Sequence, residues 1–463
     1  MHPGPDRTST AAAARPADLP PLPDRLPAVE TRAVMPRGFK AGGLAAGIKP
    51  SGRTDLGVVA VTGASAAVAA VFTTNQVVAA PIKLSRAHLN STEVSGGGRF
   101  GWTDAVVATA GSANAATGTD GEADQAEIGR ALAALLATEP ERTLAVSTGV
   151  IGVRLPVRKV REGLERLVLQ LTDGDAGLEA VAAAMMTTDT KIKLATATLE
   201  LPGPDGPAVV TVSGIAKGVG MIHPRMATML SLILTDASVA PATLFGLLSP
   251  IVQRTWNQIS VDGDTSTNDT VFLLASGESG ASVPMASAEA VRLGEAVEAV
   301  ARSLARQQAA DGEGATTLIT CQVSGAADDY DARAIARSVV SSSLFKAAVH
   351  GRDPNWGRVA GAAGNARLPD ARLLEAAGLH PVEAGPRAGR APQLDLDRLD
   401  IAIAGTLVFK GEPLLFDRAA VSRAMDAPEV LIRLHLGLGG GTGEAFGCDL
   451  TEGYVIENAE YTT

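Results

Sequence analysis

The sequence predicts an α+β protein built from layers of mixed strands and helices. Runs rich in β-branched residues, bounded by Gly and Asn, are typical of strands and occur at 58–62 and 67–74. Other segments space their apolar residues with the period of an amphipathic helix. The two kinds of segment do not alternate as a regular strand–helix–strand repeat. This pattern favours α+β layers over a doubly wound parallel sheet.

The elements of the N-terminal half follow in order. Residues 1–30 are rich in Pro, Ala, Asp and Arg without an apolar period, which predicts a disordered extension. After the strands Val58–Thr62 and Ala67–Thr74 comes a short strand at Ala105–Ala108, which leads into the Gly/Asn-rich loop 111–118. One face of a predicted helix carries the apolar residues at i, i+4, i+7 and i+8, namely Ile128, Leu132, Leu135 and Leu136.

The second half continues the mixture. A helix is predicted after an N-cap at Ser287, with an apolar face made by Leu293, Val297, Val300 and Leu304. Further strands are expected at Val209–Val212, Ser231–Leu234, Val271–Leu274 and Thr317–Val323. Residues 369–392 are rich in Pro, Arg and Gly, which indicates a surface insertion. We predict a domain boundary near residue 315, with a catalytic domain at 31–315 and a C-terminal domain at 316–463.

Composition limits the classes of protein to consider. The 463 residues are 46% hydrophobic and 19% charged, which is ordinary for a packed globular protein, and the 3% of aromatics leaves the core to Ala, Val, Leu and Ile. There are 40 basic and 50 acidic residues, a net charge of −10, and no run of Lys and Arg. Nucleic acid is therefore not an expected partner.

Cysteine, histidine and hydropathy patterns exclude further classes. The two cysteines, Cys321 and Cys448, are far apart and fit neither a disulfide scaffold nor a zinc site. The six histidines include no HxxxH pair, so no metal site is expected. No apolar run approaches the ~18 residues of a membrane helix, and the N-terminus does not resemble a signal peptide. We expect a soluble, cytoplasmic protein without a metal.

The segment IAKGVGMIHPRMATML, residues 215–230, is the most unusual. On composition alone it is a glycine loop that leads into a strand, with Thr228 as a β-former. A second interpretation makes Thr228 a nucleophile. A hydroxyl needs a base beside it, and cleavage of the chain before Thr228 would free an α-amine with a pKa near 7.7–8.0 to serve as that base. Such cleavage needs a strained, exposed peptide bond, which the glycines and Pro224 can supply.

Two other motifs could complete an acyl-transfer site. STGVIG, residues 147–152, follows an apolar run, so its loop could present backbone N–H groups to an oxyanion. MTTDTK, residues 186–191, gathers three hydroxyls and an acid at a predicted helix end. Taken singly, the first is a common turn and the second is an N-cap cluster.

Together these motifs resemble the ornithine acetyltransferase (glutamate N-acetyltransferase) family of arginine biosynthesis. The resemblance runs from about Gly38 to the last residue and keeps the family's order. Nine blocks carry it: GFKAGGLAAGIKPSG, TTNQVVAAP, STGVIG, MTTDT, AKGVGMIHPRMATML, SVDGDTSTNDT, DGEGATTL, HGRDPNWGRV and GCDLTEGYVIENAEYTT. One block would be weak evidence, whereas nine in order are specific.

The resemblance implies roles for individual residues. The bond cleaved would be Ala227–Thr228, which leaves Thr228 as the N-terminus of a β chain and as the nucleophile. Thr148 and Gly149 match the family's oxyanion-hole pair. The family's substrate-binding positions match Thr187, Lys217, Thr228, Glu313, Asn458 and Thr463. An amino-acid substrate carries a carboxylate and a cationic amine, so a lysine and a glutamate of opposite charge suit its two ends.

The resemblance also implies a reaction and an architecture. Thr228 would take the acetyl group of N-acetylornithine and pass it to glutamate, in a ping-pong cycle through a covalent acetyl-enzyme that needs no cofactor. Acetyl-CoA is a candidate co-substrate. The implied fold is a self-cleaving α/β/β/α-type sandwich, two sheets flanked by helices, with a smaller C-terminal α/β domain. The α and β chains would stay together as α2β2 or a larger assembly, with Asn458 and Thr463 reaching the site of their own or a neighbouring copy.

Departures from the family leave two alternatives open. Arg225 stands where Asn, Asp or Ser is commoner, and the N-terminal extension and the 369–392 insertion are unusual. One alternative is a related acyltransferase of a secondary pathway that acts on another N-acylated amino acid. The other is an uncleaved homologue that binds without catalysis. The intact Ala227–Thr228 pair favours an active enzyme over this second alternative.

Overall fold

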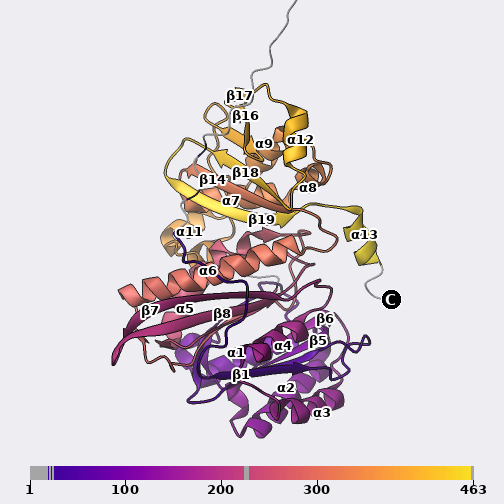
Figure 1. Cartoon of the computed structure of the whole chain (residues 1–463), viewed down its shortest axis with the longest axis vertical. Coiled ribbons are helices and arrows are strands. Elements are labelled where there is room, and N and C mark those ends of the chain that lie inside the picture. The colour runs from indigo at the N-terminus through magenta and orange to yellow at the C-terminus, as the bar shows by residue number, and fades with distance from the viewer. Residues whose placement is uncertain (1–18, 20–21, 23–24, 224–228, 460–463) are drawn as a thin grey trace, which may run out of the picture.

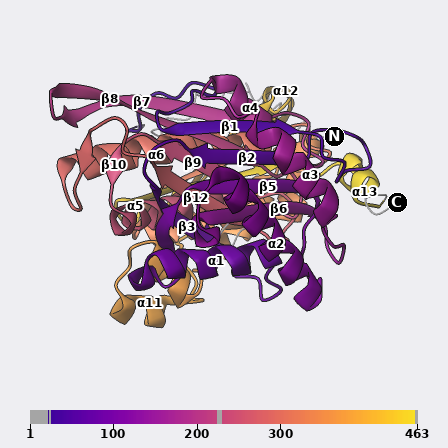
Figure 2. The ribbon, with the colours of Figure 1, turned by 90° about the horizontal axis from the view of Figure 1, so that it is seen from below.

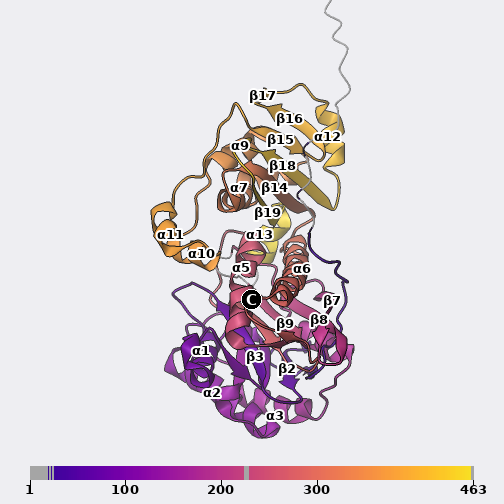
Figure 3. The ribbon, with the colours of Figure 1, turned by 90° about the vertical axis from the view of Figure 1, so that its left-hand side faces the viewer.

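The computed structural model describes residues 19, 22, 25–223 and 229–459. This part of the chain forms three large sheets interleaved with helices, and the C-terminal sheet stands at one end of an elongated molecule (Figures 1 and 3). The predicted α+β class is confirmed. The predicted extension lies mostly outside the described residues, but Glu30 already forms a bridge with Thr196.

The strands belong to four sheets. The four-stranded sheet has the order β1 (Phe39–Leu44), β2 (Leu56–Val61), β5 (Ala105–Ser112) and β6 (Thr143–Val150). The six-stranded sheet has the order β4 (Phe100–Thr103), β3 (Ala66–Phe72), β12 (Thr270–Ala275), β9 (Leu230–Thr235), β8 (Gly206–Lys217) and β7 (Lys193–Gly203). The seven-stranded sheet has the order β11 (Ile259–Ser260), β19 (Gly441–Cys448), β14 (Leu318–Ala326), β18 (Glu429–His435), β15 (Asp400–Ile403), β16 (Thr406–Lys410) and β17 (Glu412–Pro413). A two-stranded sheet pairs β10 (Ser238–Val239) with β13 (Ser282–Val283).

The helices lie between and outside these sheets. The first six are α1 (Ala80–Thr92), α2 (Gly118–Leu136), α3 (Val157–Val168), α4 (Asp175–Met185), α5 (Pro241–Arg254) and α6 (Ala288–Ala310). The C-terminal helices are α7 (Asp329–Ser341), α8 (Ser343–His350), α9 (Trp356–Gly364), α10 (Ala371–Ala376), α11 (Pro381–Arg387), α12 (Arg418–Ala424) and α13 (Glu452–Ala459). Single 3-10 turns are η1 (Val94–Gly96), η2 (Pro140–Arg142) and η3 (Trp256–Gln258).

Two sheets packed face to face form the larger part of the molecule (Figures 2 and 3). Helices α2 and α3 cover the outer face of the four-stranded sheet, and α5 and α6 cover the outer face of the six-stranded sheet. The core between the sheets joins side chains of both, such as Val146 and Phe272, with apolar residues of α1 and α4. The order is thus the predicted α/β/β/α sandwich, with α1 and α4 also lining its central core.

Helix α6 shows how the sequence pattern produces the packing. Its N-cap is Ser287, whose side chain accepts a hydrogen bond from the Ala290 N–H. The predicted apolar face, Leu293, Val297, Val300 and Leu304, is completely buried. Each such side chain contributes about 1.5–3 kcal/mol through burial. The same pattern was less accurate for α2, where Ile128 and Leu132 are buried but Leu135 is 39% exposed.

The seven-stranded sheet contacts the sandwich through the polar face of α6. Arg306 forms an ion pair of 2.8 Å with Glu429 on β18, and Arg302 donates to both carboxylate oxygens of Glu444 on β19. The expected surface insertion at 369–392 contains α10 and α11. It has a small core of its own, formed with Ala334 of α7 by Leu368, Leu374, Leu379 and Ala384. The division into domains at residue 315 stays a prediction.

Candidate active site

Six of the predicted site residues line one pocket of about 330 Å³. They come from five separate parts of the chain and were predicted from separate motifs: Thr148, Gly149, Thr187, Lys217, Glu313 and Asn458. Met229, the residue after the predicted nucleophile, is also in the wall. The fold therefore brings these residues together, although their roles remain predictions.

The pocket lies where strands of the two packed sheets end. Thr148 and Gly149 lie near the C-terminal end of β6, and Lys217 is the final residue of β8. Thr187 follows α4, and Glu313 follows α6. Strand ends expose main-chain groups and side chains together, so they are suited to hold a substrate between rigid layers.

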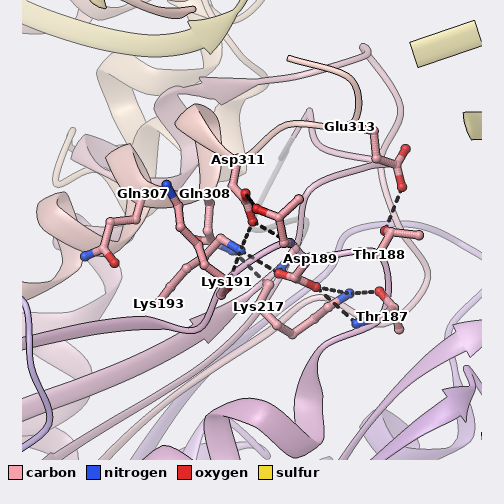
Figure 4. Close-up of polar contacts among 12 residues, drawn as sticks. Thr187, Thr188, Asp189, Lys191, Lys193, Lys217, Gln307, Gln308, Asp311 and Glu313 are labelled. Carbon is pink, nitrogen blue, oxygen red and sulfur yellow. Dashed lines mark hydrogen bonds and ion pairs between the residues drawn. The ribbon is translucent and has the colours of Figure 1, made fainter. Parts of the chain in front are cut away.

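Lys217 joins two of the motifs. Its ammonium donates hydrogen bonds to the hydroxyls of Thr148 and Thr187, at 3.1 and 2.9 Å (Figure 4 shows the second). The residue is only 8% exposed. Burial lowers the pKa of this ammonium below its ordinary value, although the carboxylate of Asp189, 3.9 Å away, opposes the shift. A desolvated cation in a pocket wall is positioned to bind a substrate carboxylate.

Lys217 lies next to a network of buried charged side chains (Figure 4). Lys193 is completely buried and lies between the carboxylates of Asp189 and Asp311, 2.7 Å from each. Asp189 also accepts hydrogen bonds from the backbone N–H groups of Gly218 and Thr187. Asp311 accepts hydrogen bonds from the backbone and side chain of Thr190. The network thus fixes the loop of Thr187 to the end of β8.

Glu313 provides the opposite charge on another wall. Its carboxylate accepts hydrogen bonds from the Thr188 hydroxyl at 2.8 Å and from the Asn458 amide at 2.9 Å. Asn458 lies on α13, so the C-terminal helix of the same chain reaches the pocket. A Cβ added at Gly220 would come within 2.1 Å of a Glu313 carboxylate oxygen, so a larger residue at 220 would displace the Glu313 side chain from this position. Among the described residues, the pocket lining therefore has one buried cation, Lys217, and two buried carboxylates, Glu313 and Asp269, which suit a zwitterionic ligand.

The segment before the predicted cleavage position is clamped by the loop 260–269. Asp262 accepts hydrogen bonds from the backbone N–H groups of Met221 and Ile222, and the Thr265 hydroxyl donates to the carbonyl of His223. Met221 has φ of +53°, a left-handed conformation that is unusual for a residue other than glycine. The segment that directly precedes residues 224–228 is therefore held by hydrogen bonds and contains a strained residue.

Several of the predicted residues lie outside the described residues. These are the cleavage pair Ala227 and Thr228, together with Arg225 and Thr463. Among the residues that the structure describes, no group of three His, Cys, Asp or Glu side chains could hold a metal ion. Within the same ranges no helix is long and apolar enough to cross a membrane.

Comparison with known proteins decides the family. The model of the ArgJ family matches residues 40–463. The chain belongs to the ArgJ family.

Relatives in this family are similar over almost their whole length. The "Arginine biosynthesis bifunctional protein ArgJ" of Thermosynechococcus vestitus is 42% identical over 447 residues, which cover 92% of this chain and 97% of the relative. The protein of the same name from Thermus thermophilus is 43% identical over 429 residues, which cover 93% and 99%. The resemblance predicted from the nine motifs is confirmed, as is the assignment to the glutamate N-acetyltransferase enzymes of arginine biosynthesis.

Two solved structures of this family are also similar to parts of the chain. The arginine biosynthesis bifunctional protein of Bacillus halodurans is 37% identical and covers 50% of this chain and 99% of its own, with a TM-score of 0.43. The ornithine acetyltransferase of Mycobacterium tuberculosis, in complex with ornithine, is 37% identical and covers 43% and 99%, with a TM-score of 0.38.

Sequence reasoning missed part of the site of this ArgJ family member. Lys193 lies outside the motifs to which roles were given, whereas Asp189 in MTTDTK and Asp311 in DGEGATTL lie within them but received no role. Asn268 was also missed, although its amide donates to the carbonyls of Ala113 and Ser147 and so joins the loop before β12 to the end of β5 and to β6. The available signal was weak: an Asp and a Lys four residues apart, with a second acid two residues before Glu313.

Substitution of Gly149 tests whether the close approach of β6 to β5 matters for the pocket. It has φ of +126°, and an added Cβ would lie 2.4 Å from the carbonyl carbon of Gly111 on β5. We expect Gly149→Ala to lower stability by about 1–3 kcal/mol and to lower kcat/KM, because β6 must move away from β5. Gly152→Ala is the matched control, since Gly152 also has a positive φ, +82°, but has open space around it. Equal kinetics in the two variants would show that the close approach of the strands is unimportant for the pocket.

The lowered pKa of the Asp189 carboxyl leads us to expect that the stability of the protein depends on pH. Burial alone would raise the pKa of its carboxyl, but Lys217, Lys193 and the Gly218 N–H outweigh burial and lower that pKa from 3.8 to about 2. A depressed pKa stabilises the fold above pH 3.8, and this contribution, about 2 kcal/mol, is lost as the pH falls toward 2. Urea unfolding between pH 5 and 2 should therefore show a shallower decline for Asp189→Asn than for the wild type or for the exposed-site control Asp173→Asn. An identical decline in all three proteins would contradict this assignment.

Proposed function

We propose that this pocket transfers the acetyl group of N2-acetyl-L-ornithine to L-glutamate through an acetyl ester on Thr228. The observation that carries the proposal is the placement of Lys217 and Glu313, opposite in charge and each only 8% exposed, in one pocket whose wall includes Met229. The substrate carboxylate would bind Lys217, and its free amine would bind Glu313. The name of the relatives, which places them in arginine biosynthesis, agrees with this substrate pair.

The reaction begins with cleavage of the peptide bond between Ala227 and Thr228. The new α-amine of Thr228 removes the proton from the Thr228 hydroxyl, and the oxygen attacks the acetyl carbonyl carbon. Donors at Thr148 and Gly149 stabilise the oxyanion. The bond from that carbon to the ornithine nitrogen breaks, and this nitrogen takes the proton as ornithine leaves. The amine of glutamate then attacks the ester, and the proton returns to the Thr228 oxygen as N-acetylglutamate leaves.

Strain before the cleavage position supports the first step. Met221 is held in a left-handed conformation by the bonds from its N–H and the Ile222 N–H to Asp262. Strain of this kind costs on the order of 1–3 kcal/mol and persists only where the surroundings enforce it. Relief of strain on cleavage would favour the products.

Pairing of strands supports continued association of the α and β chains after cleavage. The end of β8, from Val212 to Lys217, pairs with β9, from Leu230 to Thr235. These strands lie on opposite sides of the proposed cleavage position but are neighbours in the middle of the six-stranded sheet. We propose an α2β2 assembly in the cytoplasm, which mass measurement under native conditions would test.

A half-reaction tests the acetyl-enzyme. Purified protein given N-acetylornithine alone should release ornithine in one burst equal to the number of sites, and the peptide that begins with Thr228 should gain one acetyl group. Glutamate added later should remove that group. Release of ornithine only when glutamate is present, with no acetylated peptide, would contradict the ping-pong scheme. Turnover of another N-acyl amino acid in place of acetylornithine would favour the secondary-pathway alternative.

The word "bifunctional" in the relatives' name supports a second acetyl donor. We propose acetyl-CoA in this role, as a co-substrate that acetylates Thr228 before glutamate enters. Formation of N-acetylglutamate from acetyl-CoA and glutamate, without acetylornithine, tests this activity. If the wild type forms N-acetylglutamate no faster than a Thr228→Ala control, the protein transfers acetyl groups between amino acids only.

Lys217 provides a kinetic test of substrate binding. Replacing Lys217 by Gln removes the charge that we assign to the substrate carboxylate. We expect kcat/KM to fall by about 10- to 100-fold, the value of a hydrogen bond between charged groups, with a smaller effect on folding. Lys191→Gln is the matched control, because Lys191 is nearby but exposed. Unchanged kinetics in Lys217→Gln would overturn its assigned role.

A further inference from the structure

A second cavity, of about 840 Å³, lies near the first but is built from other elements. Its walls come from the end of α5 and η3, from α7, and from the 365–389 segment that contains α10 (Figure 3). One short segment borders both cavities, since Met221 lines the substrate pocket and His223 lines the second cavity. The proposed acetyl transfer uses no residue of this second cavity.

The walls of the cavity are held in place by direct contacts. The insertion attaches to α7 through Arg387, which forms ion pairs of 2.7 Å with Asp328 and 3.0 Å with Asp331. It attaches to α5 through the Ser249 hydroxyl, which donates to the carbonyl of Ala376. The cavity is therefore a formed part of the fold.

The lining of the cavity is cationic. Arg333 and Arg337 are one turn apart on α7, and Arg367 lies just before the insertion. Among the described residues, the lining contains one carboxylate, Asp370, which accepts a hydrogen bond from the Leu373 N–H as the N-cap of α10. In this described part of the lining, arginines therefore outnumber carboxylates.

Arg333 is the most informative of the three. It packs over the ring of Tyr330, with 5.0 Å from its guanidinium carbon to the ring centroid, and within the described part of the chain it forms no ion pair. Burial lowers the pKa of its guanidinium, against the attraction of Asp329. Holding a partly desolvated cation costs free energy that an anionic ligand would recover.

We propose that this cavity binds a small molecule that bears a phosphate group. Arginines from two facing elements can surround the three terminal oxygens of a phosphate, and each guanidinium offers a planar pair of donors. Amide side chains of Gln253, Asn257 and Gln258 line the same cavity and suit the polar remainder of such a molecule. The volume is in the range of sites for nucleotide-sized ligands.

Calorimetric titration with inorganic pyrophosphate, at constant ionic strength set with NaCl, tests the proposal. We expect one saturable site per chain in the wild type. The double variant Arg337→Gln/Arg367→Gln should bind pyrophosphate about 10-fold or more weakly. Arg372→Gln is the charge-matched control, because Arg372 is exposed on α10 and does not line the cavity. Its affinity should equal that of the wild type.

Two further measurements make the outcome decisive. If the double variant does not fold, Arg367→Gln alone replaces it, because Arg367 is exposed and the hydrogen bond that its side chain donates goes to the neighbouring carbonyl of Ala366. Citrate, titrated in the same way, distinguishes phosphate from carboxylate recognition. Absence of pyrophosphate binding, binding unaffected by the cavity variants, or tighter binding of citrate would each overturn the proposal.

Discussion

Replacing Thr228 by Ala is expected to leave one chain of 47.1 kDa and to abolish acetyl transfer. The wild type, analysed under denaturing conditions, should instead give two chains of 227 and 236 residues, about 23 and 24 kDa. The reason is that the same hydroxyl is proposed to cut the chain and to carry the acetyl group. Without a nucleophile the transfer rate should fall by about 10⁵-fold or more.

Thr228→Ser is the matched control for this prediction. It keeps a hydroxyl at the same position, so cleavage and transfer should persist at reduced rates. A Thr228→Ala protein that still gave two chains would show that the nucleophile is wrongly assigned. A wild type that remained one chain would leave Thr228 without its amine and would favour the non-catalytic binding homologue.

Replacing Lys193 by Met is expected to cause the largest loss of stability among single changes at the site. The ammonium of Lys193 lies 2.7 Å from both Asp189 and Asp311 and is completely buried. Its removal leaves two buried carboxylates facing each other, which costs on the order of 3–5 kcal/mol. Urea unfolding should show this as a large decrease in the midpoint concentration.

The control for Lys193 is its neighbour Lys191. Lys191 is exposed, so Lys191→Met should change the free energy of unfolding by no more than about 0.5 kcal/mol. A loss below about 1 kcal/mol for Lys193→Met would show that the network is readily rearranged. Where the variant folds, its kcat/KM should also fall, because Asp189 then loses one of the contacts that align it with Lys217.

The fold was predictable where local patterns are strong. Strand β3 was located from its β-branched residues between Gly and Asn. Helix α6 was located from periodicity, since a helix face that is buried on folding must repeat with the geometry of the helix. Helix α5 was not among the predicted helices, and Pro250 in its interior is a residue that disfavours helix. The small core of the 369–392 insertion was also unforeseen, because single Leu and Ala residues among Pro and Arg show no period.

The residues that line the pocket were predictable from the sequence, but the buried charge network that holds them in place was not. Thr148, Lys217 and Glu313 were identified because each belongs to a short, continuous block of sequence that resembles a block of the family. Lys193 and Asp311 are 118 residues apart, and an isolated Lys or Asp is normally exposed, so no local signal marks such a pair for burial.

The sequence by itself determined the family and the expected nucleophile, because these depend on motifs that can be recognised in short stretches of the chain. Only the tertiary structure decided which charges meet. It packed the ends of β6 and β8 together, buried Lys193 between two acids, and placed Arg333, Arg337 and Arg367 around a second cavity. Coulomb interactions depend on distance in space and on desolvation, and neither quantity can be read from separation along the chain.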